Sequence, residues 1–387
     1  MNLMTLQEIS EYRNESLPCT LIDQATYVST ESMLADKRGI TAISKTPNTG
    51  NVKKYYKHDV LVSNIRPYFK KVWLAEYDGT CSNDVLVFHS TGCLPNFLYL
   101  LLSSDAFFSY MTKTSKGTKM PRGDKRAIMK YEVKVPNLQA QFKICKIMDS
   151  LQSKIKINQR LNDYLAELGD ILFLQALKKN RKEIKYRKID SFCQVRGGKR
   201  LPKNSQLTSK PNAHPYIRVR DLNDATVLIL TPEMLYVDND IQMSISRYIV
   251  NTGDLIISVV GTIGLTSYIG KTLDGANLTE NCNKLTSFEG DIASWVYFYF
   301  LSSLGLEAIR LETVGAVQIK LPLKNLKSIE VPFIPTYEMK KIVPVLNKII
   351  KVIQENLIES LALTKLRDAL LPKIMSGDID IQNINIT

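Results

Sequence analysis

Two stretches of this sequence gather residues whose chemistry suits contact with a polyanion. The first is the segment 113–134, which carries eight cations against Asp124 and Glu132 and contains glycine and proline, so that part of it is a loop. Flexible cations beside free backbone N–H groups suit phosphate contacts; the alternative is a solubilising loop. The candidate DNA-binding residues in and before this segment are Arg66, Lys70, Lys71, Lys113, Lys116, Lys119, Arg122, Lys125 and Arg126.

The second stretch lies in the other half of the chain. Residues 196–203 form a glycine-containing loop with four cations. Arg218 and Arg220 alternate along a predicted strand and would project from one face, where arginine can bind guanine with two hydrogen bonds. The alternative is that each residue is structural or solvated. The candidates here are Arg196, Lys199, Arg200, Lys203, Arg218, Arg220, Thr262, Asn277, Asn281 and Lys320.

Motifs for catalysis are missing from the sequence. It has no GxxxxGK[ST] or GxGxxG phosphate loop and no Asn/Asp-Pro-Pro-Tyr/Phe motif of amino-methyltransferases. Its three histidines form no triad or metal-ligand pattern, and Cys81, His89 and Cys93 lack a fourth ligand for zinc. We therefore predict no catalytic residue and no metal site. A nuclease with hidden carboxylates is the alternative.

Composition agrees with a binding protein. The chain has 387 residues, enough for two or three domains, with 44% hydrophobic and 23% charged residues. Its net charge of +13 favours a polyanionic partner such as nucleic acid; a lysine-rich solvated surface is the alternative. No signal peptide or membrane-spanning apolar run is found, so a cytoplasmic location is expected.

The elements that must position these cations include two long helices. From Pro136 to about Lys179 the sequence reads as one helix with a narrow apolar stripe, which cannot be buried without a second helix. Asn158 interrupts the stripe. Its predicted members are Ile144, Ile147, Leu151, Ile155, Leu161, Leu165, Leu168 and Leu172.

The second helix is an internal repeat of the first. An offset of 198 residues places Ile155, Asn158 and Leu165 on Ile353, Asn356 and Leu363. An antiparallel pair about a pseudo-twofold axis would bring Asn158 and Asn356 together, where buried polar groups can set the register. The alternative is that both face solvent at the edge of the seam.

The fold expected is therefore α+β. Two mixed α/β globular domains, pseudo-twofold related, would be separated by an antiparallel pair of long coiled-coil helices. The boundaries are 1–136 for the first globular domain, 137–180 for the first long helix, 181–335 for the second globular domain, 336–376 for the second long helix and 377–387 for a C-terminal tail.

Repeated motifs at the helix junctions resemble the specificity subunits of Type I restriction-modification systems. The segment Gly117–Arg122 followed by Val133–Pro136 is similar to that family's entry into its first helix, and Ser328–Pro335 repeats it. Gln139–Gln141 is similar to the family's Pro-x-x-Glu-Gln helix start, although alanine replaces the acid, and the second copy keeps the acid but loses the glutamine. The ending Leu370–Asp378 looks like the family's Leu-Leu-Pro-Lys-Leu-Met-Ser-Gly-Glu.

The resemblance implies a non-catalytic subunit whose two domains each read half of a split DNA target. It also implies helices that set the spacing and dock two modification (methyltransferase) subunits, with restriction subunits joining them. S-adenosylmethionine, ATP and magnesium would be bound by those partners, and this chain would need no cofactor. The alternatives are the recognition part of another phage-defence or single-chain restriction system, and a coiled-coil scaffold that does not bind DNA.

Overall fold

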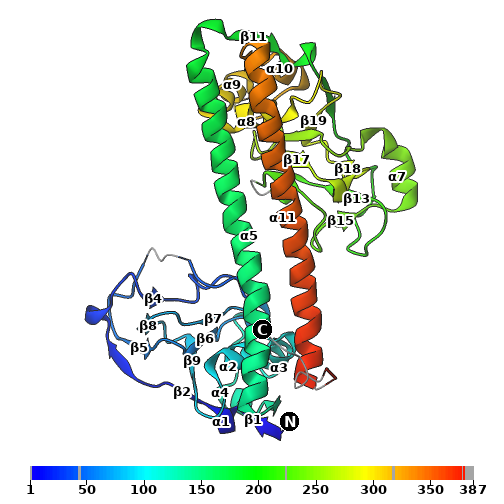
Figure 1. Ribbon diagram of the computed structural model, residues 1–387. Helices are drawn as coiled ribbons and strands as arrows, with labels where there is room; N and C mark the ends of the chain where they lie inside the picture. The colour runs from blue at the N-terminus through cyan, green and yellow to red at the C-terminus, as the bar shows by residue number, and fades with distance from the viewer. Residues whose placement is uncertain (1, 42–44, 223–224, 316–318, 377, 380–387) are drawn as a thin grey trace. The chain divides into compact units, whose positions relative to one another are not determined.

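The computed structural model describes residues 2–41, 45–222, 225–315, 319–376 and 378–379. The chain divides into two compact units, each containing sheets and a part of both long helices (Figure 1). Unit 1 comprises 1–153 and 364–387, and unit 2 comprises 154–363. The chain is therefore α+β, with two sheet-rich units and two long helices.

Unit 1 is built around the buried strands β6 and β9, whose side chains form its core with helices α2 and α3. Its helices apart from the long ones are α1 (Leu6–Ile9), α2 (Pro95–Leu102), α3 (Asp105–Lys113) and α4 (Lys125–Met129). Its strands are β1 (Asn2–Thr5), β2 (Ser10–Tyr12), β3 (Ser16–Pro18), β4 (Tyr27–Val28), β5 (Asn51–Tyr55), β6 (Val60–Ser63), β7 (Val72–Leu74), β8 (Gly79–Cys81), β9 (Val85–Ser90) and β10 (Glu132–Val135).

Unit 2 has its core where β16 and β19 pack against the aromatic helix α8. Its shorter helices are α6 (Val219–Leu222), α7 (Asn239–Ile245), α8 (Ala293–Leu301), α9 (Ser303–Glu312) and α10 (Leu323–Ser328). Its strands are β11 (Lys185–Lys188), β12 (Gln194–Gly197), β13 (Pro215–Ile217), β14 (Val227–Leu228), β15 (Leu235–Tyr236), β16 (Leu255–Ser258), β17 (Thr266–Ile269), β18 (Asn277–Leu278), β19 (Cys282–Thr286) and β20 (Glu330–Phe333).

The two units repeat one topology. The main sheet of unit 1 has the order β2-β9-β6-β7, and that of unit 2 has β12-β19-β16-β17 with β14 added at its edge. In both units a terminal antiparallel pair closes the fold, β1 with β10 and β11 with β20. A short parallel pair also recurs, β4 with β8 and β13 with β18. The duplication seen in the helices therefore extends through the sheets.

The long helices are α5 (Leu138–Lys179) and α11 (Thr336–Ser376), each continuous and the latter running through Pro344 (Figure 1). Within unit 2 they are antiparallel: Lys179 lies 3.3 Å from Glu338 near the start of α11, and Lys154 lies 3.1 Å from Glu359. In unit 1, Arg367 Nη1 donates to Gln152 Oε1 over 2.6 Å.

The buried seam of α5 differs from the predicted stripe. Ile155 and Leu165 face the seam as expected, but Leu161 and Leu168 are 41% and 45% exposed. The true seam passes through residues 155, 158, 162, 165 and 169, in steps of three and four, so that two asparagines and a glycine hold positions normally filled by apolar side chains. Assigning only apolar residues to the seam required a step of six residues, and this brought Leu161 and Leu168, which lie on the outer face, into the predicted stripe.

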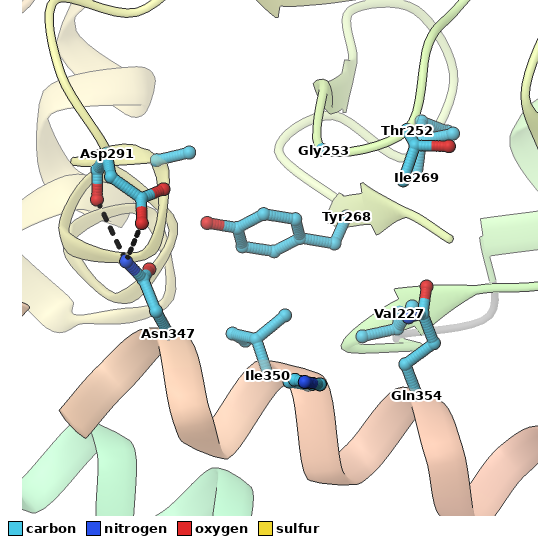
Figure 2. A pocket seen from close by; sticks show the side chains of 11 residues that line it. Val227, Thr252, Gly253, Tyr268, Ile269, Asp291, Asn347, Ile350 and Gln354 are labelled. Atoms are coloured by element: carbon cyan, nitrogen blue, oxygen red, sulfur yellow. Dashed lines mark hydrogen bonds between the residues drawn. The ribbon is translucent and has the colours of Figure 1, made fainter. Parts of the chain in front are cut away.

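A close approach explains the glycine at position 169. A Cβ atom at Gly169 would overlap the ring of Phe298, which packs on α5 from α8. On α11, Asn347 Nδ2 donates to Asp291 Oδ2 over 2.7 Å and Gln354 Oε1 accepts from Lys271 N over 2.9 Å, on either side of the buried ring of Tyr268 (Figure 2). Burial raises the pKa of Tyr268 well above its ordinary value. These contacts attach the sheet of unit 2 to its segment of α11.

Unit 1 also contains several short elements. The apolar run after Pro95 divides into α2 and α3 because Ser104 caps a new helix by accepting a hydrogen bond from Phe107 N. The strand β4 covers only Tyr27–Val28. The predicted C-terminal tail, 377–387, lies outside the described residues except for Asp378 and Ile379.

Candidate nucleic-acid interface

A cation-bearing hairpin is attached to the loop that follows the central strand of unit 1. Lys116 and Arg122 exchange both backbone hydrogen bonds, at 2.8 and 2.9 Å, and Gly117 supplies the positive φ that the turn needs. Arg66 N donates to the carbonyl of Pro121 over 2.8 Å, and Ile65 bridges to Arg122. The structure therefore brings together Arg66, Lys116, Lys119 and Arg122, which sequence reasoning had grouped only by charge.

Unit 2 contains the same arrangement at the equivalent place. Val314 and Lys320 exchange backbone hydrogen bonds of 2.9 Å, and Lys320 bridges to Val260 in the loop that follows β16. Lys320 and Thr262 are both exposed. The repeated hairpin is thus a framework that presents different side chains in the two units.

The basic loop 196–203 of unit 2 lies beside this framework. Lys199 N donates to the carbonyl of Leu278, and Val259 N donates to the carbonyl of Asn281. The segment 278–281 therefore connects the basic loop to the loop that follows β16. Arg196, Lys199, Arg200 and Lys203 are exposed, and Arg200 pairs with Glu280 at 3.0 Å.

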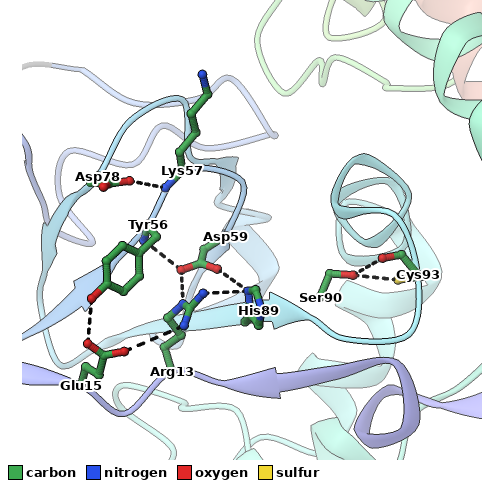
Figure 3. A network of polar contacts seen from close by, with 9 residues as sticks. All are labelled: Arg13, Glu15, Tyr56, Lys57, Asp59, Asp78, His89, Ser90 and Cys93. Atoms are coloured by element: carbon green, nitrogen blue, oxygen red, sulfur yellow. Dashed lines mark hydrogen bonds and ion pairs between the residues drawn. The ribbon is translucent and has the colours of Figure 1, made fainter.

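A buried aspartate anchors the start of each central strand. In unit 1, Asp59 accepts hydrogen bonds from Tyr56 N at 2.9 Å and Arg13 Nε at 2.6 Å, and it lies 3.0 Å from His89 Nδ1 (Figure 3). In unit 2, Asp254 accepts from Asn251 N at 2.9 Å and pairs with the buried Lys284. The turn that holds the aspartate is the same in both units, but the opposing positive charge comes from Arg13 in unit 1 and from Lys284 in unit 2. Each unit therefore balances its buried carboxylate with a different residue.

Acidic neighbours already pair with some of the predicted cations. Lys116 Nζ lies 2.5 Å from Asp124, and that hydrogen bond is the main reason that the pKa of Asp124 falls to about 2. Arg122 pairs with Asp84 at 3.0 Å, and Lys70 with Asp105 at 2.9 Å. The end of α3, the hairpin and the start of α4 are the more open part of this surface, because their remaining cations are exposed: Lys113, Lys119, Lys125 and Arg126.

Three of the residues predicted to contact DNA have partners within the fold, and the first is Arg218. Arg218 and Arg220 do not alternate on a strand, because β13 ends at Ile217 and the Asp221 carboxylate accepts from Arg218 N at 2.8 Å, which starts the helical turn α6. The guanidinium of Arg218 is held by Asp221 at 2.6 Å and is largely buried, whereas Arg220 is exposed.

Asn277 and Lys71 are also occupied within the fold. Asn277 is 0% exposed and donates to Gln242 Oε1, so in this conformation it cannot reach a base. Lys71 Nζ donates to the carbonyl of Thr30 over 2.7 Å, and desolvation lowers its pKa. Asn281 is half-buried and contributes its carbonyl to Val259. The residue type alone therefore did not show which polar side chains are used within the fold and which are exposed.

The two asparagines of the helix repeat come together in unit 2. Asn158 is 1% exposed, and its Nδ2 lies 3.4 Å from the backbone oxygen of Asn356, 2.8 Å from Glu359 Oε2 and 3.3 Å from Ser360 Oγ. Asn356 Nδ2 donates to Asn162 Oδ1 over 2.8 Å. The offset of 198 residues relates Asn162 to Ser360, so these two cross-helix contacts are repeats of one another.

Sequence reasoning missed two exposed apolar features. The first, which we call the outer stripe, covers one face of α5 with Ile157, Leu161, Tyr164, Leu168 and Ile171, each more than 40% exposed. The second is the pair Tyr68 and Phe69 within the basic segment 66–71. The signal for Tyr68 and Phe69 that the sequence contained was an aromatic pair between cations, shortly after an apolar strand.

Metal-ligand clusters and membrane-spanning helices are both absent from the described part of the chain. There, no group of three or more His, Cys, Asp or Glu side chains is placed to hold a metal ion. Cys81 is buried, which raises its pKa to about 12, and His89 faces Asp59. Within the same ranges, no helix has both the length and the apolar character needed to cross a bilayer.

Comparison with known proteins gives one consistent family. Residues 2–167 and 181–363 match the sequence model described as the Type I restriction modification DNA specificity domain. The chain is 21% identical to the Type I restriction enzyme HindI specificity subunit of Haemophilus influenzae, over 97% of this chain and 98% of that one. It is 25% identical to the EcoDI specificity subunit of Escherichia coli over 36% of this chain and 32% of the relative.

A solved structure supports the fold. The crystal structure of a Type I restriction-modification S subunit from M. genitalium matches with a TM-score of 0.60 and 16% identity, over 100% of this chain and 96% of that chain. The likeness at this identity concerns the arrangement of elements. It agrees with two sheet-rich units and two long helices in one chain.

Proposed function

Because this chain belongs to the family of Type I restriction-modification DNA specificity domains, we propose that it is the sequence-specific DNA-binding subunit of a Type I complex. Each unit reads one half of a bipartite target, and α5 and α11 set the spacing between the halves. The chain itself contributes recognition. Adenine methylation with S-adenosylmethionine, and translocation and cleavage with ATP and magnesium, belong to its modification and restriction partners.

The repeated hairpin is the observation that carries this proposal. In both units, at the same topological position, a hairpin is bonded to the loop after the central strand and exposes cations, Lys119 and Arg122 in one and Lys320 in the other. A scaffold that binds only protein has no need for exposed cations on this element in both copies of the repeat. Two DNA-binding units that present different side chains suit a target whose two halves differ in base sequence.

The outer stripe supports the docking of modification subunits. Its residues recur in steps of four and three along α5, the spacing by which a partner helix packs into a coiled coil. At the repeat offset of 198 residues, α11 carries instead Glu355, Glu359, Ala362, Leu366 and Ala369. We therefore expect two docking faces of unequal apolar character.

The proposal is tested by isolating the chain with its modification subunits and measuring duplex binding between about 50 and 200 mM salt. A protein that neutralises several phosphates loses affinity steeply over that range. Sequencing of methylated adenines in a host that carries the system would then give the target. Salt-independent binding, or methylation without a split motif, would contradict the proposal.

A further inference from the structure

Unit 1 exposes two adjacent aromatic rings at the tip of a tight turn. Tyr68 and Phe69 are 49% and 40% exposed, and their ring centroids lie 4.8 Å apart with the planes inclined at 55°. Single exposed apolar residues are common on protein surfaces. A ring pair on a short turn is a more specific feature, because much of both rings stays open to a ligand.

The turn is held in a defined conformation by its backbone. Arg66 and Lys70, on either side of the 3-10 turn Pro67–Phe69, have φ values of 49° and 50°, a left-handed conformation that non-glycine residues seldom adopt. Phe69 N donates to the carbonyl of Arg66 over 3.0 Å, and Lys70 N to that of Pro67 over 2.9 Å. Both strained residues therefore close one compact loop.

Two neighbouring segments support the turn. Asp36 N and Lys37 N donate to the carbonyls of Phe69 and Lys70, at 2.9 and 3.0 Å. Asp105 at the start of α3 pairs with the ammonium groups of Lys37 and Lys70, each at 2.9 Å. With the backbone and both lysines engaged, the rings are presented on a rigid platform, so little conformational entropy is lost when a ligand binds them.

The surroundings of the rings are cationic, and the turn belongs to the candidate interface. Arg66 is exposed and its backbone N–H donates to the carbonyl of Pro121 in the hairpin, whose Lys119 is also exposed. Cations around an exposed aromatic pair suit a ligand with an anionic backbone and flat apolar faces. Nucleic-acid bases stacked between phosphates have this character.

Unit 2 lacks this feature at the equivalent place. After β16 the chain continues through Gly261, Thr262, Ile263 and Gly264, with φ values of 82° and 91° at the two glycines and no aromatic ring. We propose that Tyr68 and Phe69 are an aromatic wedge that packs against a base step in the half-site read by unit 1, and that unit 2 reads its half-site without such a wedge. This inference rests on the proposed function.

The test uses the complete complex and duplexes with 2-aminopurine at successive positions of both half-sites. Apart from the adenines that the modification subunits flip out for methylation, wild type is expected to raise the fluorescence at one step of the half-site read by unit 1 only, because a wedge unstacks the bases that it contacts. Tyr68→Ala with Phe69→Ala should abolish that rise and lower affinity on the order of 10- to 100-fold, with an unchanged salt slope. Tyr186→Ala, at an exposed aromatic of β11, is the matched control.

Two further measurements keep the inference falsifiable if the alanine variant folds poorly. The ring-preserving pair Tyr68→Phe and Phe69→Tyr should retain the signal and the affinity; their loss in this variant would overturn the wedge. In unaltered protein, photocrosslinking to 5-iodouracil should attach Tyr68 or Phe69 to DNA, and crosslinks at other residues alone would also overturn it. If wild type binds no DNA, the proposed function fails; if wild type binds and the alanine variant matches it, only the wedge fails.

Discussion

Asn158 of α5 and Asn356 of α11, which occupy the same place in the two copies of the repeat, lie side by side in unit 2, with 3.4 Å between Asn158 Nδ2 and the backbone oxygen of Asn356. Each reaches across the helix pair to the repeat-related position, Asn158 to Ser360 and Asn356 to Asn162. Polar groups buried at one layer penalise any slipped pairing, because a slip leaves donors without acceptors. We propose that this layer sets the helix register.

The first prediction concerns the stability that this layer provides. Asn158→Ala should lower the free energy of unfolding by about 1–3 kcal/mol, since it removes the donor to Glu359 and Ser360 and leaves a small cavity. Chemical denaturation of the complete chain measures the change. Gln159→Ala, at the next position of α5 but exposed, is the control and should change stability by less than about 0.5 kcal/mol. Equal effects of the two substitutions would mean that the buried layer adds nothing specific.

The second prediction concerns the pH dependence of the same layer. The pKa of Glu359 is lowered, first because Asn158 donates a hydrogen bond to its carboxylate and then because Lys154 does so. A carboxyl whose pKa is lowered by folding contributes stability above its unfolded pKa of about 4.3, and the contribution is lost as the pH falls through the folded value. Wild type should therefore exceed Glu359→Gln in stability at pH 7, and the difference should narrow in acid. A difference that is constant with pH would contradict this.

The third prediction concerns the cations of the hairpin. Asp124→Asn should release Lys116, while the amide oxygen still caps α4 by accepting from the N–H groups of Arg126 and Ala127. One more phosphate contact would steepen the logarithmic salt dependence of DNA binding by about 1, and Lys119→Ala should reduce it by about 1.

Lys71→Ala is the control for these two variants. The Lys71 ammonium is held by the carbonyl of Thr30, so its removal should leave the salt slope unchanged. A slope that falls as much for Lys71→Ala as for Lys119→Ala would show that exposure in the free chain does not identify the phosphate contacts.

The fourth prediction concerns the outer stripe. Leu161→Glu should weaken the binding of a modification subunit by about 10-fold or more, because a carboxylate would be buried in an apolar interface. Leu366→Glu, at the position that corresponds to Leu168, should have a smaller effect, since its neighbours on α11 are glutamate and alanine. Titration followed by native mass spectrometry would count the bound subunits. Equal losses would argue against unequal docking faces.

Sequence reasoning identified the duplicated helices but misplaced some residues of the seam between them. Ile155, Asn158 and Leu165 were placed correctly in the seam, whereas Leu161 and Leu168 were not, because Asn162 and Gly169 occupy seam positions without being apolar.

The same limit applies to the candidate site. Arg218 and Arg220 alternate as strand residues do, yet Asp221 captures the backbone of Arg218 and begins a helical turn. Asn277 has the chemistry of a base-reading residue but is buried, which depends on long-range packing that no local pattern contains.

The fifth prediction tests whether the helices set the spacing of the target. Removing two heptads from both α5 and α11, at sites related by the 198-residue offset, should keep the seam in register and shorten the paired segment by about 21 Å. At about 3.4 Å per base pair, the unread gap between the half-sites should shrink by about six base pairs. The position of methylated adenines in a host carrying the variant measures the gap.

Shortening α5 alone is the control for this deletion. It separates Asn158 from Asn356, so it should destabilise the helix pair instead of giving a shorter defined gap. A symmetric deletion that leaves the methylated motif unchanged would mean that something other than helix length determines the spacing. A symmetric deletion that shortens the gap, beside a one-sided deletion that abolishes methylation, would show that paired helix length and register act together.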